Sequence, residues 1–200
     1  TALAGSTGLP WFYYDNSPGE LNGYELELTA TPLDNLLISF SLGQNEYENA
    51  DKNPLSVNYI APDYLFQPEF NASLGLQYAI QLGGGGTLTP RIDAFYQGER
   101  HNGPANARPG VQGVTANTCP DQCVPSFTVL NARLTYEPPN SDWRLSLAST
   151  NVTDKLYWQQ YSAAITVNAA TGVVTNTAPA GRSGVPSAPR EWALTVEKRF

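Results

Sequence analysis

The sequence predicts an all-β protein whose antiparallel strands form a segment of a transmembrane β-barrel wall. Three observations predict this fold class: apolar and polar residues alternate with period two, tight turns alternate with long polar segments, and aromatic residues collect near strand ends. Charged residues make up only 14% of the 200 residues, whereas soluble domains contain roughly 25%. This composition suits a sheet with one face in an apolar solvent.

The alternation recurs in seven segments, which we expect to be strands: residues 23–30, 36–44, 70–82, 87–97, 127–136, 143–150 and 191–200. The clearest is 70–82, which reaches or slightly exceeds the 9–11 residues of a membrane-spanning strand. Pro90 lacks a backbone donor, so the strand start or a local bulge must accommodate it. An eighth, incomplete strand is expected around residues 11–14.

The connections between these strands are of two kinds. Short turns rich in Pro, Gly, Asn and Asp are expected at residues 31–35, 83–86 and 138–142. Long polar segments occupy residues 46–68, 98–125 and 152–190. Because short and long connections alternate strictly, they leave opposite edges of the sheet, as short periplasmic turns and long extracellular loops do in outer-membrane barrels.

Aromatic residues lie near both predicted membrane boundaries, where rings with one polar edge are favoured. The outer set is Tyr24, Tyr96 and Trp192, and the periplasmic set is Tyr136, Trp143 and Phe200. In the final strand we expect Phe200 to face lipid, with Glu197 and Arg199 facing the lumen. Leu76 is expected near the middle of the lipid-facing side.

The remaining composition excludes several functions. A net charge of −7 argues against a nucleic-acid partner, and no run of about 18 apolar residues could form a transmembrane helix. Cys119 and Cys123 lie far from His101, the only histidine, which favours a short-loop disulfide over a metal site; a pair of inert thiols is the alternative. No nucleophile-elbow pattern accompanies His101, so we expect neither an enzyme nor a cofactor.

Four segments resemble bacterial outer-membrane proteins. The ending ALTVEKRF is similar to their closing strand, whose terminal aromatic residue, here Phe200, is recognised by the barrel-insertion machinery. STNVTDKLYW, residues 149–158, resembles an Asn-x-x-Asp-Lys-x-Tyr segment of TonB-dependent receptors. The matching positions are Asn151, Asp154, Lys155 and Tyr157. The hairpins at residues 21–43 and 64–100 resemble recurrent hairpins of the same family.

This resemblance implies that residues 1–200 are one partial barrel domain, with seven to eight strands of a 22-stranded barrel at its C-terminal end and without the plug domain. The whole protein would be a receptor of the bacterial cell outer membrane that takes up a scarce ligand, most often a ferric siderophore. The implied partners are outer-membrane lipid, the plug domain and remaining barrel strands of the same protein, TonB through the missing N-terminal part, and the insertion machinery.

Two sets of residues are candidates for function. Charged residues expected to face the lumen are either plug contacts or hydrated wall residues: Glu25, Glu27, Arg91, Asp93, Arg133, Glu197 and Arg199. Aromatic residues and arginine are common binding anchors, so the segment 152–190 supplies ligand-binding candidates. These are Tyr157, Trp158, Tyr161 and Arg182. Tyr157 and Trp158 have an alternative role as aromatic residues of the membrane boundary.

Two other functions remain open from the sequence. An autonomous eight-stranded outer-membrane barrel with a structural or adhesive role would need a full strand within residues 1–15. A soluble carbohydrate-binding β-sandwich would use its aromatic residues to line a sugar site, but long loops on the same side argue against it. The ligand is not identified by the sequence, and vitamin B12, carbohydrate or another metal chelate stay open.

Overall fold

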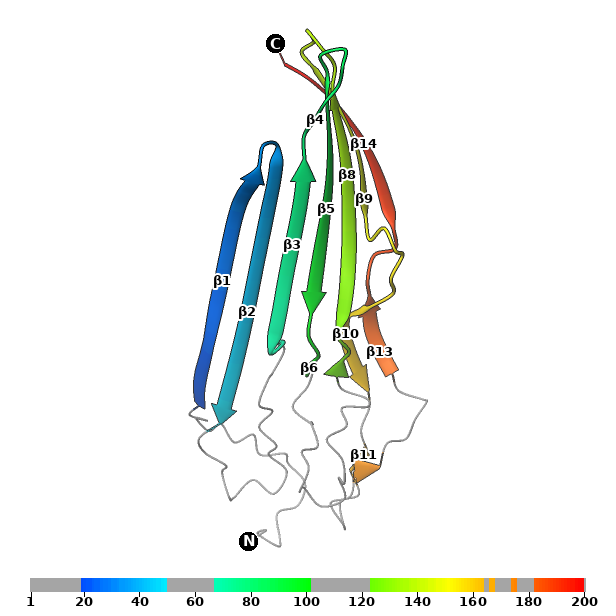
Figure 1. Cartoon of the computed structure of the whole chain (residues 1–200). Coiled ribbons are helices and arrows are strands. Elements are labelled where there is room, and N and C mark those ends of the chain that lie inside the picture. Colours follow the sequence, from blue (N-terminus) through cyan, green and yellow to red (C-terminus); the bar gives the residue numbers. More distant parts are fainter. Residues whose placement is uncertain are drawn as a thin grey trace, which may run out of the picture.

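The computed structural model describes residues 19–49, 67–101, 123–163, 166–167, 174–175 and 182–199. Seven long strands form one antiparallel sheet (Figure 1): β1 (Gly19–Leu33), β2 (Leu36–Asn49), β3 (Phe70–Tyr78), β5 (Thr87–Gln97), β8 (Phe127–Glu137), β9 (Trp143–Thr150) and β14 (Glu191–Lys198). All seven predicted strands and the all-β fold class are confirmed. In this part of the chain there is no helix long and apolar enough to cross a membrane. The incomplete strand expected at residues 11–14 lies outside the described residues.

Long strands that follow one another in sequence are neighbours in space, so the sheet is a simple meander. The three tight turns lie at one edge of the sheet, and the strand ends that the long segments join lie at the other edge, as predicted (Figure 1). Asn35, Gly85 and Asn140 occupy the tight turns with φ of 68°, 91° and 51°. Asparagine and glycine tolerate this left-handed region better than other residues, which is why they occur here.

The register of the strands separates apolar from polar side chains. Leu26 lies opposite Leu42, Ile38 opposite Leu76, and the same rows continue across the sheet to Leu147 opposite Leu194. These side chains share one side, which we call the apolar face; the charged and hydroxyl side chains share the other, the polar face. A slip of one residue in any strand would reverse its two faces, so the pattern fixes the register.

The strand predicted at residues 70–82 is interrupted once. It consists of β3 and a short β4 (Ile80–Gln81), which both pair with β5 in one continuous register. The pairing of β3 with β5 ends at Gln77 and Arg91. The next β5 residue toward the tight turn is Pro90, so the interruption lies beside this proline. Because proline has no N–H to donate, the ladder is broken there, and the sheet accommodates it by this gap and not by a strand start.

The described residues form a single layer with very little interior. Their buried hydrophobic residues are Val124, Phe127 and Val129, whereas most large side chains of the apolar face are exposed. No second sheet packs against this one within the described part, so the β-sandwich alternative is not supported. The outermost strands of the sheet, β1 and β14, are not paired with each other, and the sheet is therefore not closed among the described residues.

Short strand pairs extend from the edge where the long connections lie. Residues 98–125 contain β6 (Arg100–His101) and β7 (Cys123–Val124), and residues 152–190 contain β10 (Trp158–Ala163) paired with β13 (Arg182–Pro186). A further pair joins β11 (Thr166–Val167) to β12 (Val174–Thr175). The sequence predicted only long polar segments here, because these strands lack a sustained alternation.

Candidate functional site

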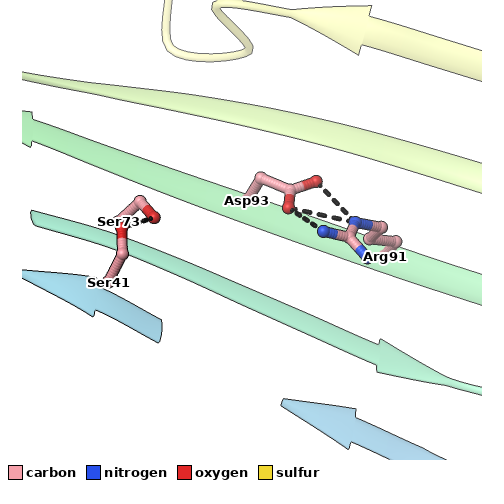
Figure 2. Close-up of polar contacts among 4 residues, drawn as sticks. All are labelled: Ser41, Ser73, Arg91 and Asp93. Atoms are coloured by element: carbon pink, nitrogen blue, oxygen red, sulfur yellow. Dashed lines mark hydrogen bonds and ion pairs between the residues drawn. The ribbon is translucent and has the colours of Figure 1, made fainter. Parts of the chain in front are cut away.

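The polar face carries an ion pair at its centre. On β5, Arg91 Nη2 lies 2.6 Å from Asp93 Oδ1, and Arg91 Nε donates to both carboxylate oxygens at 3.0 and 2.9 Å (Figure 2). Residues two apart on a strand point to the same side, which is why this pair forms within one strand. The placement of both residues on the polar face is as expected.

The ion pair lies over a glycine on the neighbouring strand β3. Gly75 is opposite Asp93, and a Cβ atom at Gly75 would lie 2.8 Å from Asp93 Oδ1 and 2.9 Å from Arg91 Nη2. It would also lie 2.5 Å from Ser39 Oγ. The ion pair can occupy this position only because Gly75 has no side chain, and this role of Gly75 was not predicted from the sequence.

Other charged candidates on the polar face are more open. Arg133 lies directly opposite Arg91, and its side chain is exposed. Like charges directly opposite each other are unfavourable. Asp93 reduces the repulsion between Arg91 and Arg133 because it neutralises the charge of Arg91. Glu25 and Glu27 are exposed on β1, opposite Gly43 and Ser41.

A second charge network joins three strands near the tight-turn edge. Arg144 on β9 lies 2.7 Å from Glu137 on β8 and 3.3 Å from Glu197 on β14. Glu197 was a candidate, but Arg144 and Glu137 were missed, although alternation already placed them on the same face. Nearby, the backbone N–H of Arg199 donates to the Asp142 carbonyl at 2.9 Å, which ties the end of the last strand to the β8–β9 turn.

At the opposite end of the polar face the wall is apolar. Phe127 is 8% exposed and stacks on Tyr157, with ring centroids 4.0 Å apart and an interplanar angle of 16°. Phe95 packs against Phe127 in a tilted arrangement at 6.4 Å, and Val129 is buried beside them. Phe95, Phe127 and Val129 are apolar residues at positions that alternation assigns to the polar face. This exception to the alternation could have indicated the cluster.

The structure places two of the four ligand-binding candidates. Tyr157 is half-buried against Phe127, and Trp158 lies against Gly184 of β13, where a Cβ would be 2.8 Å from its Cε3. Tyr161 and Arg182 belong to the paired strands β10 and β13, but their side chains lie outside the described residues.

Two further predictions fall on undescribed atoms. Cys119 and Phe200 lie outside the described residues, and of Cys123 only the backbone is described, opposite His101. The disulfide and the outward direction of Phe200 therefore stay predictions.

The segment that resembles the family motif is a tight, hydrogen-bonded turn between β9 and β10. Asn151 and Asp154 both have positive φ, 49° and 51°. The side chain of Asn151 donates to the carbonyls of Lys155 and Ala188 at 3.0 and 3.2 Å, and accepts from the Lys155 N–H at 2.9 Å. The motif therefore shapes the backbone in this structure.

Comparison with known proteins agrees with this architecture. A family model described as "TonB dependent receptor-like, beta-barrel" matches residues 1–152. No curated protein sequence matches the chain significantly.

Several solved structures share the fold. They include BauA, the ferric preacinetobactin receptor of Acinetobacter baumannii (18% identity, TM-score 0.58, 89% of this chain and 22% of that one). FyuA, the ferric yersiniabactin uptake receptor of Yersinia pestis, has 15% identity and a TM-score of 0.56 over 91% of this chain and 24% of its own. Fiu, the ferric-catecholate import receptor of E. coli K12, has 17% identity and a TM-score of 0.59 over 91% of this chain and 21% of its own. The chain thus spans less than a quarter of each of these proteins.

Proposed function

Because the chain belongs to the TonB-dependent receptor β-barrel family, we propose that it forms part of the wall of a bacterial outer-membrane receptor that takes up a ferric siderophore. Its role is to separate lipid from lumen and to carry the outer segments that surround the ligand entrance. No chemical step is assigned to any of its residues.

The observation that carries the proposal is the apolar face. Rows of leucine, isoleucine, valine and aromatic side chains are aligned by the strand register and exposed on one side of the sheet. Each such side chain gains roughly 1.5–3 kcal/mol when it leaves water, so the face requires an apolar solvent or partner. The lengths of β3 and β5, 9 and 11 residues, match tilted strands that cross a bilayer.

Aromatic residues at both ends of this face support a membrane position. Phe70 and Tyr96 pack together at 5.8 Å near the edge with the long connections, and Lys198 lies 5.3 Å from the Trp143 ring near the opposite edge. Aromatic and basic side chains are typical of the boundary between lipid and water. We therefore assign the apolar face to outer-membrane lipid and the tight turns to the periplasmic side.

The polar face would line the lumen and contact the plug domain of the same protein. Candidates for this contact are the exposed Glu25, Glu27 and Arg133, together with the Arg91–Asp93 pair and Glu197. The free edges of β1 and β14 would pair with the remaining barrel strands. Contact with TonB is expected from parts of the protein outside this chain, and recognition by the insertion machinery from the closing strand.

The ligand class rests on the printed functions of the similar structures, which are receptors or importers of ferric siderophores. Their identity to this chain is low, so the fold alone is shared, and the choice of ligand needs a direct test.

Uptake of radioactive iron by cells that express the full-length receptor would test the proposal. Iron would be supplied as ferric preacinetobactin, ferric yersiniabactin or a ferric catecholate, to cells with and without the receptor and with and without TonB. We expect receptor- and TonB-dependent uptake of at least one chelate, with no receptor-dependent uptake of cyanocobalamin. Uptake of cyanocobalamin alone, or iron uptake that persists without TonB, would overturn the assignment.

A further inference from the structure

The chain leaves β9, at the sheet edge that carries the long segments, through one asparagine. Asn151 is 5% exposed and adopts φ of 49°, a conformation that asparagine tolerates. Its N–H donates to Asn131 Oδ1 on β8 at 3.0 Å, and the next N–H, of Val152, donates to the Leu130 carbonyl at 2.8 Å. The turn is thereby attached to the neighbouring strand of the wall.

The side chain of Asn151 attaches the turn to the returning chain before β14. Asn151 Nδ2 reaches the carbonyl of Ala188, while Asp154 Oδ1 accepts from the N–H of Arg190 at 2.9 Å. Ser187, buried to 9% exposure, donates its N–H to the Tyr157 carbonyl at 2.8 Å and accepts from the Tyr157 N–H at 3.2 Å. Both ends of the segment 152–190 are therefore joined at its base.

A third attachment is the aromatic stack. Tyr157 lies at the end of the turn, immediately before β10, and its ring covers Phe127 on the wall. A ring that packs face to face on a buried phenylalanine has that face unavailable to a ligand. Stacked rings add about 0.5–1.5 kcal/mol to the free energy gained by burial alone.

We propose that residues 151–157, together with residues 187–190, form a clasp that fixes the β10–β13 hairpin as a rigid extension of the barrel wall, with Asn151 and Asp154 as positioning residues and Tyr157 as a packing residue. At the centre of these contacts Asn151 and Ser187 are buried and hydrogen-bonded, and a buried polar network that is satisfied holds a single arrangement. The hairpin is then a fixed side of the outer entrance and does not swing as a lid about its base. The inference rests on the proposed function only in treating this edge as the ligand entrance.

The chain offers a matched control inside the clasp. Lys155 belongs to the same motif, but the contacts of the turn use its backbone N–H and carbonyl, and its side chain is exposed. Lys155→Ala should therefore leave the clasp intact. Asn151→Asp keeps an acceptor for the Lys155 N–H but presents an oxygen to the carbonyls of Lys155 and Ala188, so it should open the clasp.

The test is the distribution of distances between spin labels at Gln159 on β10 and Thr128 on β8, measured by pulsed electron resonance on the full-length receptor without ligand. We expect one narrow peak for the parent and for Lys155→Ala, and loss of that peak in Asn151→Ala and Asn151→Asp. A broad parent distribution, or an unchanged narrow peak in Asn151→Ala, would overturn the clasp.

Two variants of Tyr157 keep the test open if the Asn151 variants do not reach the membrane. Tyr157→Leu removes the stack and should broaden the distribution, whereas Tyr157→Phe keeps the ring and should retain both the narrow peak and the half-saturation of iron uptake. A changed half-saturation with an intact peak in Tyr157→Phe would show that the hydroxyl contacts ligand, against a packing role. The distance measurement uses no ligand, so failure of the uptake proposal would leave its result unaffected.

Discussion

Leu76 of β3 lies directly opposite Ile92 of β5, and both side chains are exposed on the apolar face, Leu76 to 42%. Ile38 flanks Leu76 on the other side, so the row crosses three strands near the middle of the sheet. A soluble protein would cover such a row with a second layer, and the described residues contain none. The position of Leu76 in this row is therefore expected to lie near the middle of the bilayer.

Leu76→Arg is expected to lower the free energy of unfolding in a bilayer by about 2–4 kcal/mol, because a charge on the lipid face of a barrel is most costly at mid-membrane. Urea unfolding of the full-length receptor in phospholipid vesicles would measure it. Thr29→Arg is the matched control, since Thr29 lies at a similar depth on the polar face, opposite Ser39. Equal costs for the two variants would contradict the assignment of faces.

The two edges of the sheet should be accessible from opposite sides of the membrane. We expect Gln159→Cys, on the exposed part of β10, to react with an impermeant thiol reagent on intact cells. Gly84→Cys should react only after the outer membrane is permeabilised, because it lies in the tight turn before β5. A Cβ at Gly84 meets no atom within 4 Å, so the substitution fits without strain. If Gly84→Cys reacted on intact cells and Gln159→Cys did not, the assignment of the two edges to the two sides of the membrane would be wrong. The parent protein is the control for labelling of Cys119 and Cys123.

The long strands were predictable because alternation is a local property that each segment carries by itself. The Arg91–Asp93 pair was also predictable as a shared face, since its members are two residues apart on one strand. The link from Arg144 to Glu197 was harder to foresee, because it depends on the register between β9 and β14 across a segment of about forty residues. Alternation shows the face of a residue but does not identify its neighbour.

The outer hairpin and its clasp were not predictable for a related reason. Tyr157 meets Phe127 only because Asn151 and Asp154 turn the backbone, and these residues resembled a family motif without showing what they contact. As an aromatic residue, Tyr157 was a ligand-binding candidate with a boundary role as the alternative, and the contact with Phe127 could not be read from the sequence. Its neighbour Trp158 likewise lies against Gly184.

Asn35 offers a test of the β1–β2 turn. Its φ of 68° costs most residues about 1–2 kcal/mol, so Asn35→Ala should destabilise the barrel by roughly that amount. Asn35→Gly should be close to neutral, because glycine adopts this region freely. Urea unfolding of both variants in vesicles would measure the difference, and equal stabilities for Ala and Gly would mean that the turn relaxes to another conformation.

Gly75→Ala should disturb the centre of the polar face. The added Cβ would approach Ser39 Oγ to 2.5 Å and the Arg91–Asp93 pair to less than 3.0 Å, so these side chains must move. Overpacking of this kind typically costs about 1–3 kcal/mol. Removal of one of the crowded atoms should recover part of this loss of stability. We expect Ser39→Gly to recover part of the loss in the double variant, since it removes the closest of the three atoms.

Gly83→Ala is the control for this last prediction, because a Cβ at Gly83 meets nothing within 4 Å and the loss of glycine flexibility is the same. Unfolding in urea would compare Gly75→Ala, the Ser39→Gly/Gly75→Ala double variant and Gly83→Ala in one membrane. If Gly75→Ala were as stable as Gly83→Ala, the ion pair would have room to shift, and glycine at this position would not be required to seat it. If Ser39→Gly failed to recover any stability, the strain would lie with Arg91 and Asp93 alone.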